Sequence, residues 1–442
     1  MRISRIAVHG LFDRFNHELT FDPCERITIM IGPNGYGKTT ILRILNVLFN
    51  YSPRSLGRMP FEELHVDFDD GSRLTVDRIS GESSPRLSYA TPTREMEPYI
   101  PEPLSTAQGV SFPLGIIEDI IPGLERIGAS EWRNVHTDDV LDLDDVIETY
   151  EDVLPFSVEK HEQKIPPWLE EIRASLPVRF IDTERLTDLS THGRRLRSRS
   201  SYSYITPERT VRLYSKKLAS EVQKTLTQYA TLSQSLDRSF PARLVEEPTS
   251  EPLSKEQLAQ DLEEVDKRRS EIIEAGLLAQ EHASLSVPDI DSIDDSRIGV
   301  LAVYAQDATE KLDVFEDLYL RVNTFVRIAN ARLLHKKISV SQEGLKVSNS
   351  DGAALELEML SSGEQHEIVL LFDLLFGTKK NSLIMVDEPE LSLHVAWQRE
   401  MLKDLQEMAE LSDFRVLLAT HSPQIIGDRM DLTIDLQEQE VE

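Results

Sequence analysis

The chain is poor in cysteine, in long apolar runs and in basic residues, and each shortage excludes a class of protein. Its 442 residues include one cysteine, Cys24, so an internal disulfide framework is excluded, and a small turn residue explains Cys24 more simply than a reactive thiol does. No stretch approaches the ~20 apolar residues of a membrane span, and the N-terminus opens into an alternating, strand-like pattern instead of an apolar signal core. We therefore expect a soluble cytoplasmic protein with no membrane partner.

The charge balance is strongly acidic, with 77 Asp and Glu residues against 48 Lys and Arg residues and a formal charge of −29. Such a surface repels nucleic acid on average, so contact with DNA or RNA would need a local basic patch or a partner that supplies positive charge. The segment Arg194–Arg199 is such a patch and is followed by Tyr202 and Tyr204. It is a candidate contact for nucleic acid or for a partner, although an exposed loop with counter-charges nearby is the simpler explanation.

The apolar pattern predicts an α/β nucleotide-binding core made of two parts that are separate in sequence. Residues 1–200 contain a buried strand at 26–31, an apolar-periodic helix after it and a hairpin at 64–78. Residues 336–442 return to strand signals, beginning with alternating segments at 337–342, 344–349 and 354–358.

Residues 201–335, between these two parts, predict a mostly helical insertion. One helix begins near residue 205, a second opens at the capping box Ser254–Gln257, and a third runs unbroken from Leu301 through Phe325, with linkers at 241–253 and 288–296. The insertion would be a helical hairpin or small bundle, and it would serve as a dimerisation or partner arm.

A glycine-rich loop follows the buried strand and precedes a helix. Residues 32–39 read Gly-Pro-Asn-Gly-Tyr-Gly-Lys-Thr and match G-x-x-x-x-G-K-[ST] in the strand–turn–helix context that this pattern requires. Glycines let main-chain N–H groups converge on phosphate oxygens at a helix N-terminus. Lys38 would reach the β- and γ-phosphates, and the Thr39 hydroxyl would ligate Mg²⁺. The sequence therefore predicts ATP and Mg²⁺ as ligands, and the expected nucleotide-binding residues of the loop are Asn34, Gly35, Gly37, Lys38, Thr39 and Thr40.

An apolar strand that begins at Ser382 ends in the acidic pair Asp387 and Glu388. Four apolar residues that run into two acids suit a central parallel strand whose carboxyl end faces a ligand. Asp387 would hold Mg²⁺ directly or through water, and Glu388 would polarise the attacking water as a general base. Alone, the pattern also fits a buried strand that meets a solvated acidic turn; together with the phosphate loop it predicts a catalytic site.

The segment Leu360–Gln365 places serine and glycine before a helix predicted at 367–376. Such residues make a second anion-binding nest, although a helix cap explains them equally well. Because one chain already cradles its phosphates with the first loop, Ser361 and Gly363 would bind the γ-phosphate held by another copy.

His421 follows a further apolar strand, which runs from Arg415 to Ala419. It could hydrogen-bond the γ-phosphate or the attacking water. A lone histidine is more often structural, but its place at a strand end after the acidic pair favours the catalytic role.

In this order the segments resemble the motif set of the ABC ATPases: phosphate loop, signature, acidic strand and switch histidine. The resemblance implies an ABC-type P-loop NTPase core that is split by the mostly helical insertion, with Ser361 and Gly363 as the signature serine and second glycine. Ser362 and Glu364 depart from the commoner L-S-G-G-Q, so the contact geometry of the signature stays open.

A closer resemblance is to stand-alone ATPases of bacterial anti-phage systems, the Septu-type (PtuA) and PARIS-type (AriA) proteins, which are akin to the OLD-family ATPase domain. The segments Leu360–His366, Asp387–His394 and Ala419–Gln424 carry it. OLD-type enzymes continue past the switch histidine into a nuclease domain, whereas this chain ends 21 residues after His421. The resemblance therefore implies a separate effector, an HNH or Toprim nuclease, and contact with nucleic acid through that effector or through Arg194–Arg199.

Two more segments resemble parts of these families. Arg14 is similar to the arginine that flanks adenine in related DNA-repair ATPases. The segment Phe180–Leu186 is similar to an element of the defence ATPases, in which Glu184 or Arg185 would sense the nucleotide, although a buried strand with a capped exit explains it equally well.

Together these assignments predict a head-to-tail homodimer, or a larger ring or filament built from it. Each site would combine residues of one copy with the signature of the other: Lys38, Thr39, Asp387, Glu388 and His421 with Ser361 and Gly363. A DNA-repair ATPase of the RecF or Rad50 kind is an alternative that the acidic balance and the short insertion argue against. A transporter ATPase is disfavoured by the long separation of phosphate loop and signature, and an ATP-locked scaffold with little turnover remains open.

Overall fold

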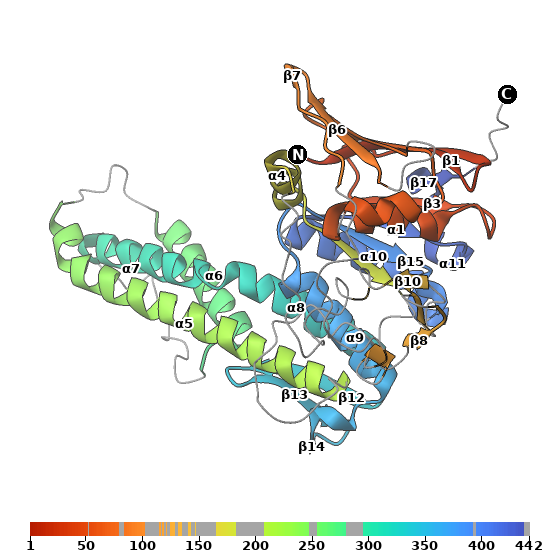
Figure 1. Ribbon diagram of the computed structural model, residues 1–442. Coiled ribbons are helices and arrows are strands. Elements are labelled where there is room, and N and C mark those ends of the chain that lie inside the picture. Colours follow the sequence, from red (N-terminus) through yellow and green to blue (C-terminus); the bar gives the residue numbers. More distant parts are fainter. Residues whose placement is uncertain are drawn as a thin grey trace. The chain divides into compact units, whose positions relative to one another are not determined.

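The computed structural model describes residues 1–51, 53–78, 84–101, 165–182, 207–246, 254–279, 295–391 and 395–436, together with short stretches between 115 and 146 (Figure 1). Contacts divide the chain into two compact units. The first unit contains Met1–Arg185, Gly193–Arg199 and Lys379–Glu442, and the second contains Leu186–His192 and Ser200–Thr378.

The first unit is built on a five-stranded parallel sheet in the order β11-β15-β16-β3-β17. Its strands are β3 (Ile27–Ile31), β11 (Val178–Asp182), β15 (Ser382–Asp387), β16 (Phe414–Ala419) and β17 (Thr433–Asp435). Every residue of β15 is buried, as expected for a central strand of a parallel sheet that is covered on both faces. Because β16 pairs with β3, the two ends of the sequence are neighbours in this sheet.

A six-stranded antiparallel sheet in the order β2-β1-β4-β5-β6-β7 belongs to the same unit. Its strands are β1 (Ile3–Leu11), β2 (Phe15–Thr20), β4 (Glu63–Phe68), β5 (Arg73–Asp77), β6 (Arg86–Thr91) and β7 (Arg94–Glu95). Buried and half-buried residues alternate along β4, so one face of the sheet meets the core and the other meets solvent. The pairing of β4 with β5 confirms the hairpin predicted at 64–78.

Helix α1 (Lys38–Asn50) lies between the two sheets of the first unit (Figure 1). Its buried residues Ile41 and Leu45 join one apolar cluster with Val66 of the antiparallel sheet and Met385 of the parallel sheet. Helix α4 (Pro167–Ser175) extends this cluster, and α10 (Val395–Ser412) contacts β16. The strand–loop–helix that carries the phosphate loop is therefore held on both sides by packed sheet.

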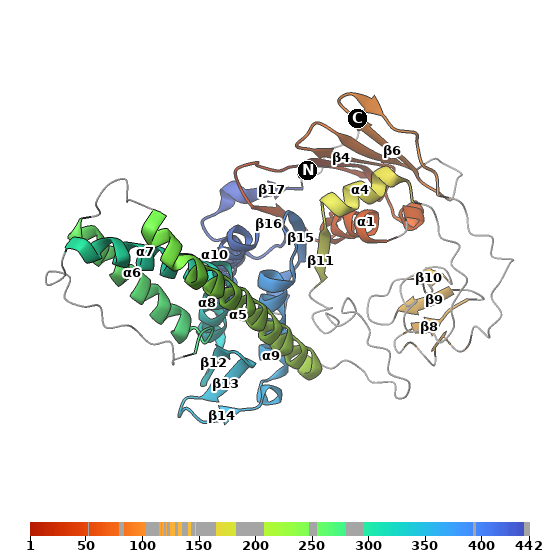
Figure 2. The same ribbon diagram turned by 90° about the vertical axis from the view of Figure 1, so that its left-hand side faces the viewer.

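The second unit contains the helical insertion and a three-stranded antiparallel sheet in the order β12-β13-β14 (Figure 2). Its elements are α5 (Pro207–Glu246), α6 (Lys255–Glu274), α7 (Asp295–Asp313), α8 (Glu316–Arg332), β12 (Lys336–Ser341), β13 (Gly344–Asn349), β14 (Ala354–Leu355), η5 (Leu357–Met359), α9 (Ser362–Phe372) and the π-helical turn η6 (Asp373–Gly377). Both hydrogen bonds of the predicted capping box at Ser254 are present at the start of α6.

Aromatic side chains join α9 to the helical insertion. Phe372 of α9 stacks on Tyr214 of α5, with ring centroids 4.7 Å apart, and on Phe376, at 4.8 Å. Phe325 of α8 meets the Phe372 ring edge-on. The second unit consequently extends through Thr378. From the sequence alone, the C-terminal part of the core was expected to begin earlier, at residue 336.

The predicted third helix is wrong in one respect, because the structure divides it into α7 and α8. The break falls at Val314 and Phe315, where Phe315 is fully buried and its ring lies 5.3 Å from that of Tyr229 on α5. Helix α5 continues through Pro241 into the expected linker, and α9 starts at Ser362 rather than at residue 367, because Ser361 caps it.

The remaining described elements are short: η1 (Pro53–Arg58), β8 (Leu124–Arg126), β9 (Glu131–Asn134), β10 (Val140–Asp142), η7 (Pro389–Leu391), α11 (Pro423–Ile426) and η8 (Met430–Leu432). Within the part of the chain that the structure describes, none of the helices has the length and apolar character needed to cross a membrane.

Candidate functional site

The predicted motifs of the first unit meet at the carboxyl edge of the parallel sheet. Asp387 at the end of β15 is in register with Ala419 of β16, and Ala419 is in register with Met30 of β3. Two backbone hydrogen bonds join the segments that leave these strands: Glu388 N–H donates to the Ala419 carbonyl at 2.8 Å, and Thr420 N–H donates to the Met30 carbonyl at 3.2 Å. This edge is where ligands bind in open parallel sheets.

The phosphate loop connects β3 to α1 through two glycines with left-handed backbone. Gly35 has a φ of 88° and Gly37 a φ of 89°, a region that other residues rarely adopt. A Cβ atom at Gly37 would lie 2.3 Å from Leu11 Cδ2, whereas one at Gly35 would meet nothing within 4 Å. Packing therefore requires glycine at Gly37, and the exposed side of the loop at Asn34 and Gly35 is open to a ligand.

Lys38 is buried at the start of α1, and its ammonium points back to the loop. Nζ donates to the Gly32 carbonyl at 2.7 Å and to the Pro33 carbonyl at 3.3 Å. The positive charge thus lies at the loop and at a helix N-terminus, where an anion is favoured. Thr39 and Thr40 follow, half-buried, in the first turn of α1.

The donor atoms at this edge fit Mg²⁺. Thr39 contributes a hydroxyl and Asp387 a carboxylate, and Mg²⁺ prefers oxygen ligands of this kind together with substrate phosphates. Asp387 is 6 % exposed at the end of its strand. Thr39 follows the carboxyl end of β3 through the phosphate loop, and Asp387 is the last residue of β15. In the sheet, β16 lies between these two strands.

An open hollow of ≈ 450 Å³ lies beside the phosphate loop and is lined by Phe12, Arg14, Phe15, Asn34, Gly35 and Tyr36. Phe15 stacks on Tyr36, with ring centroids 5.1 Å apart, and the Arg14 guanidinium carbon lies 5.1 Å from the centroid of Phe15. Flat aromatic and guanidinium groups are suited to stacking with a base. The structure therefore places Arg14 next to the phosphate loop.

His17 of β2 contacts the backbone of the phosphate loop, and this contact was not expected from the sequence. The buried imidazole lies with Nε2 2.9 Å from the Tyr36 carbonyl. Burial lowers the pKa of His17, which keeps the ring neutral at pH 7. In the tautomer that this contact implies, Nε2–H donates to the carbonyl oxygen.

Glu388 and His421 lie close together at the sheet edge. Glu388 follows Asp387 with a φ of 40°, a value that is rare for a residue with a side chain. Its Oε1 lies 3.7 Å from His421 Nδ1, and the two side chains are 26 % and 48 % exposed. The carboxylate and the imidazole are thus near each other and both reach solvent.

Glu390 holds the His421 segment and was not expected from the sequence. Its Oε1 accepts hydrogen bonds from the Thr420 hydroxyl at 2.8 Å and from the His421 N–H at 3.1 Å, and it lies 3.3 Å from His421 Nδ1. The Glu390 side chain is 8 % exposed. A buried carboxylate needs such partners to remain stable in its charged form.

A second set of buried polar groups extends from this carboxylate. Gln398 of α10 donates from Nε2 to the Glu390 carbonyl at 3.2 Å and accepts from the Ser422 hydroxyl at 3.1 Å. Ser422 N–H donates in turn to Thr420 Oγ1 at 3.0 Å. The acidic residue two positions after Glu388 and the hydroxyls that flank His421 were the signals in the sequence that could have revealed this network.

The signature segment caps α9 in the second unit. Glu364 Oε2 accepts from the Ser361 N–H at 2.6 Å and from the Ser361 hydroxyl at 2.8 Å, while Glu364 N–H donates to Ser361 Oγ at 3.4 Å. Lys336 Nζ donates to the same Oε2 at 2.7 Å. Burial opposes ionisation of Glu364, but the hydrogen bonds from Lys336 and Ser361 outweigh it and lower its pKa. The helix-cap explanation is therefore present in the structure, with Ser361 exposed and open space at Gly363.

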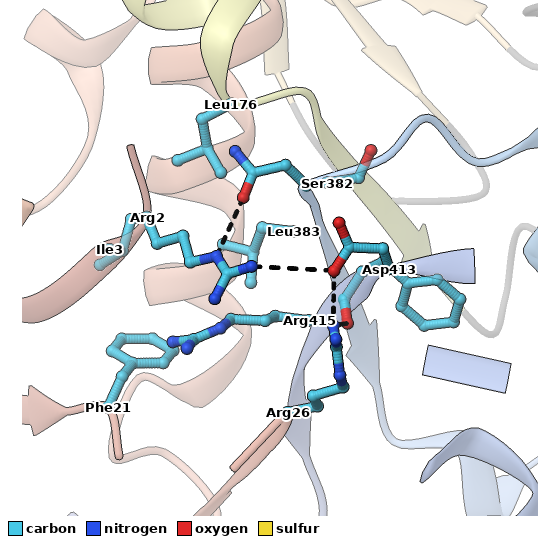
Figure 3. A pocket seen from close by; sticks show the side chains of 11 residues that line it. Arg2, Ile3, Phe21, Arg26, Leu176, Ser382, Leu383, Asp413 and Arg415 are labelled. Atoms are coloured by element: carbon cyan, nitrogen blue, oxygen red, sulfur yellow. Dashed lines mark hydrogen bonds and ion pairs between the residues drawn. The ribbon is translucent and has the colours of Figure 1, made fainter. Parts of the chain in front are cut away.

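A small cavity of ≈ 10 Å³ lies at the opposite, amino end of the parallel strands (Figure 3). It is surrounded by Arg2, Arg26 and Arg415; Asp413 accepts from Arg26 Nη1 at 2.9 Å, and Arg2 Nε donates to Asn381 Oδ1 at 3.2 Å. The cavity has room for about one water molecule. Its polar contacts join the start of β1 to the parallel sheet, at the edge opposite to the phosphate loop.

Several predicted residues lie outside the described part of the chain. They are Glu184, Arg185, and the basic patch Arg194–Arg199. The strand β11 that precedes Glu184 ends in register with Asp387, so the chain leaves β11 at the same edge as the acidic pair.

Residues 138–427 match the family model described as "AAA domain, putative AbiEii toxin, Type IV TA system". The match includes the signature segment, the acidic strand and His421, and the phosphate loop precedes it.

Two solved structures are similar to the chain. One is the Smc head domain with an extended coiled coil bound to the C-terminal domain of ScpA from Pyrococcus furiosus, with 11% identity, 99% of this chain and 94% of that chain covered, and a TM-score of 0.34. The other is the SMC head domain from Thermotoga maritima, with 11% identity, 100% and 96% covered, and a TM-score of 0.36.

The fold is α/β, a P-loop NTPase core that a mostly helical insertion splits, as predicted. The phosphate loop after β3 and the acidic pair after β15 are those of a P-loop NTPase, and the matching family model is that of an AAA domain. Because the matched residues make up more than half of the chain, the chain belongs to the family "AAA domain, putative AbiEii toxin, Type IV TA system".

Proposed function

We propose that the chain hydrolyses ATP to ADP and phosphate at a site that two copies complete, and that this cycle controls a separate effector. One observation carries the proposal: the register of Asp387, Ala419 and Met30 brings the acidic pair, the switch histidine and the phosphate loop to one edge of a parallel sheet. Membership in an AAA-domain family supports an NTPase.

Each residue at this edge has a chemical part. Lys38 and the loop N–H groups bind the β- and γ-phosphates, and Mg²⁺, held by Thr39 and Asp387, would offset the charge on the phosphate oxygens. Glu388 accepts a proton from water as the water oxygen bonds to the γ-phosphorus and the bond to the β-phosphate oxygen breaks. His421 donates a hydrogen bond to the γ-phosphate or holds the water. Glu390 acts through His421 and positions its ring.

A second copy would supply Ser361 and Gly363. Ser361 is exposed, and the space at Gly363 is open, so both are accessible to a nucleotide held by another chain. The Glu364 carboxylate beside them would repel a γ-phosphate. The ion pair with Lys336, at 2.7 Å, offsets that charge and keeps the helix N-terminus usable as an anion site.

The hydrogen bond between Ser361 and Glu364 favours a second candidate function, an ATP-locked scaffold with little turnover. The Ser361 hydroxyl is engaged by Glu364 within its own chain, and it would have to turn to a phosphate for the composite site to close. A site that closes with difficulty could bind ATP and hydrolyse it slowly.

The proposed biological role is anti-phage defence. ATP would clamp two copies head to tail, within a ring or filament if the assembly is larger. Hydrolysis would loosen them, and the helical insertion would pass the change to an HNH or Toprim nuclease encoded separately. Nucleic acid would be reached through this nuclease or through Arg194–Arg199. The family description names a toxin and a type IV toxin–antitoxin system, and control of a toxic protein is a related arrangement.

Steady-state phosphate release by the wild type and by Glu388→Gln, each with Mg²⁺ and ATP, tests the catalytic proposal. We expect the substitution to lower release at least 100-fold, because it removes the general base. It should also trap an ATP-dependent dimer in sedimentation velocity. Equal release by the two proteins, with a stable ATP-bound assembly in both, would favour the scaffold.

Titration calorimetry with Lys38→Ala tests the phosphate loop separately. We expect ATP binding to be lost, since the buried ammonium is removed from the loop. Lys346→Ala is the matched control, because that lysine is 58 % exposed on β13 and pairs only with Glu343 among the described residues. Unchanged ATP affinity in Lys38→Ala would refute the assignment of the loop.

Plaque counts on cells that carry the gene together with its neighbouring reading frame test the defence role. We expect protection with the wild type and its loss with Glu388→Gln. Equal plaque counts with and without the pair of genes, over a broad panel of phages, would contradict it.

A further inference from the structure

We propose that His9, Glu63 and His65 form a binding site for a divalent transition-metal ion of the zinc class, on the face of the antiparallel sheet that points away from the core. A ring nitrogen of each histidine and a carboxylate oxygen of Glu63 all lie within 4.8 Å of one another. Zinc bonds to such donors at about 2.0–2.2 Å. For an ion to bind, the three side chains would rotate so that these atoms lie at that distance from a common centre.

The sheet sets the spacing of these donors. His9 of β1 is the cross-strand partner of Glu63 on β4, and His65 lies two residues further along β4. Leu64, between the two donors of β4, is buried in the core cluster, as is Val8 beside His9. Side chains alternate along a strand, so the three donors share the opposite face. Because β4 is paired on both sides, with β1 and β5, the backbone under the group is fixed.

His65 already has the orientation of a ligand. Its Nδ1 lies 3.2 Å from the Thr75 hydroxyl on β5, and its Nε2 lies 3.0 Å from Glu63 Oε1. A metal-bound histidine commonly uses its second ring nitrogen for such a hydrogen bond, which fixes its tautomer and its ring orientation. With Nδ1–H donated to Thr75, Nε2 presents a lone pair to the carboxylate, and the two repel unless a proton or a metal ion lies between them. The His9 ring stands edge-on, its centroid 5.8 Å from that of His65.

The charge around the group also favours a cation. Asp77 of β5 is the cross-strand partner of Glu63, so a second carboxylate stands beside the first on the same face of the sheet. Arg86 of β6, the next partner in that row, is the nearest basic residue of the register. An ion bound to Glu63 would offset the repulsion between the two carboxylates.

The donor set selects the metal. Two imidazoles and one carboxylate suit zinc and its neighbours in the first transition row, whereas Mg²⁺ prefers ligands that are all oxygen. The site would therefore take a different ion from the nucleotide edge. It would join β1 to β4 two residues before Leu11, whose side chain lies against Gly37 of the phosphate loop. Its consequence would be a stiffer support beneath that loop.

Zinc titration of the full chain by calorimetry, with ZnCl₂ as the probe, tests the proposal. We expect one tight site per chain in the wild type, and at least a tenfold loss of affinity in His9→Gln and in His65→Gln. Glu343→Gln is the matched control, because Glu343 belongs to the second unit, is 84 % exposed and pairs with Lys346. It should leave the affinity unchanged, and MgCl₂ should not compete.

Thermal unfolding and a spectroscopic probe give independent readouts. Zinc should raise the midpoint of wild-type unfolding by several degrees and leave His9→Gln unmoved, and CoCl₂ should give visible absorption bands of a four-coordinate ion only when both histidines are present. Since His9 is half-exposed, its substitution should leave the fold intact, and unchanged ATP binding would verify this. No tight zinc site in the wild type, or the same zinc affinity in wild type, His9→Gln and His65→Gln, would overturn the proposal.

Discussion

Replacing Glu390 by glutamine tests whether a buried carboxylate positions the switch histidine. Glu390 Oε1 accepts from the Thr420 hydroxyl and from the His421 N–H, and it faces His421 Nδ1 at 3.3 Å. Glutamine keeps an acceptor oxygen for the first two contacts but removes the charge. A hydrogen bond to a charged group contributes about 1.5–3 kcal/mol, and a neutral one about 1 kcal/mol. The substitution should therefore weaken the hold on His421 by about 0.5–2 kcal/mol.

This difference converts to a loss of turnover. If the histidine must occupy one orientation in the transition state, about 0.5–2 kcal/mol corresponds to a rate about 2–30-fold lower. Phosphate release at saturating ATP measures it, with ATP affinity from calorimetry to show that binding is kept. Glu18→Gln, in an exposed pair with Arg5, should release phosphate at the wild-type rate.

A double-mutant cycle separates positioning from an independent role. If Glu390 acts through His421, then His421→Ala combined with Glu390→Gln should be no slower than His421→Ala alone. Multiplication of the two effects would show that Glu390 acts elsewhere. A rate for Glu390→Gln within twofold of the wild type, while His421→Ala is slow, would refute the reasoning altogether.

Three further outcomes follow from the structure. Glu364→Gln keeps an acceptor for the α9 cap but removes the negative charge beside Ser361, so ATP-dependent dimerisation in sedimentation velocity should become several-fold tighter; weaker dimerisation would contradict this. Burial lowers the pKa of His17, so below its ordinary value of ~6.5 the unfolded chain binds a proton that the folded chain does not. Urea unfolding should therefore show stability that falls between pH 7 and pH 5, and His17→Gln should flatten this part of the profile. Phe372→Ala removes a ring that stacks on Tyr214 and Phe376, so it should destabilise the second unit by about 3–5 kcal/mol in thermal unfolding. In the same measurement Leu334→Ala, at a position 77 % exposed, should be close to neutral.

Features that depend on adjacent residues could be predicted from the sequence. The strand, glycine turn and helix around Lys38 need only local patterns, and so does the capping box at Ser254, where the signals are three residues apart. The hairpin of β4 and β5 belongs to the same class, because Gly71 in its turn adopts a φ of 79°. Each of these elements is specified by a short stretch of chain.

Features that depend on long-range contacts escaped prediction. The partner of Thr420 is Glu390, 30 residues away, and only the parallel register of β15 and β16 brings them together. At the break between α7 and α8, Phe315 packs against Tyr229 of α5, a contact that helical periodicity does not reveal. His17 likewise meets the phosphate loop through the pairing of β1 with β2 and not through any motif.

The pairing of β3 with β16 has a consequence for the order of events during translation. Arg26 and Asp413, which hydrogen-bond at the base of these strands, are 387 residues apart. A nascent chain on the ribosome thus carries its phosphate loop long before the strand beside it, the acidic pair and the histidine have been synthesised. Chains released before β16 is made would lack the complete sheet edge on which the proposed hydrolysis depends.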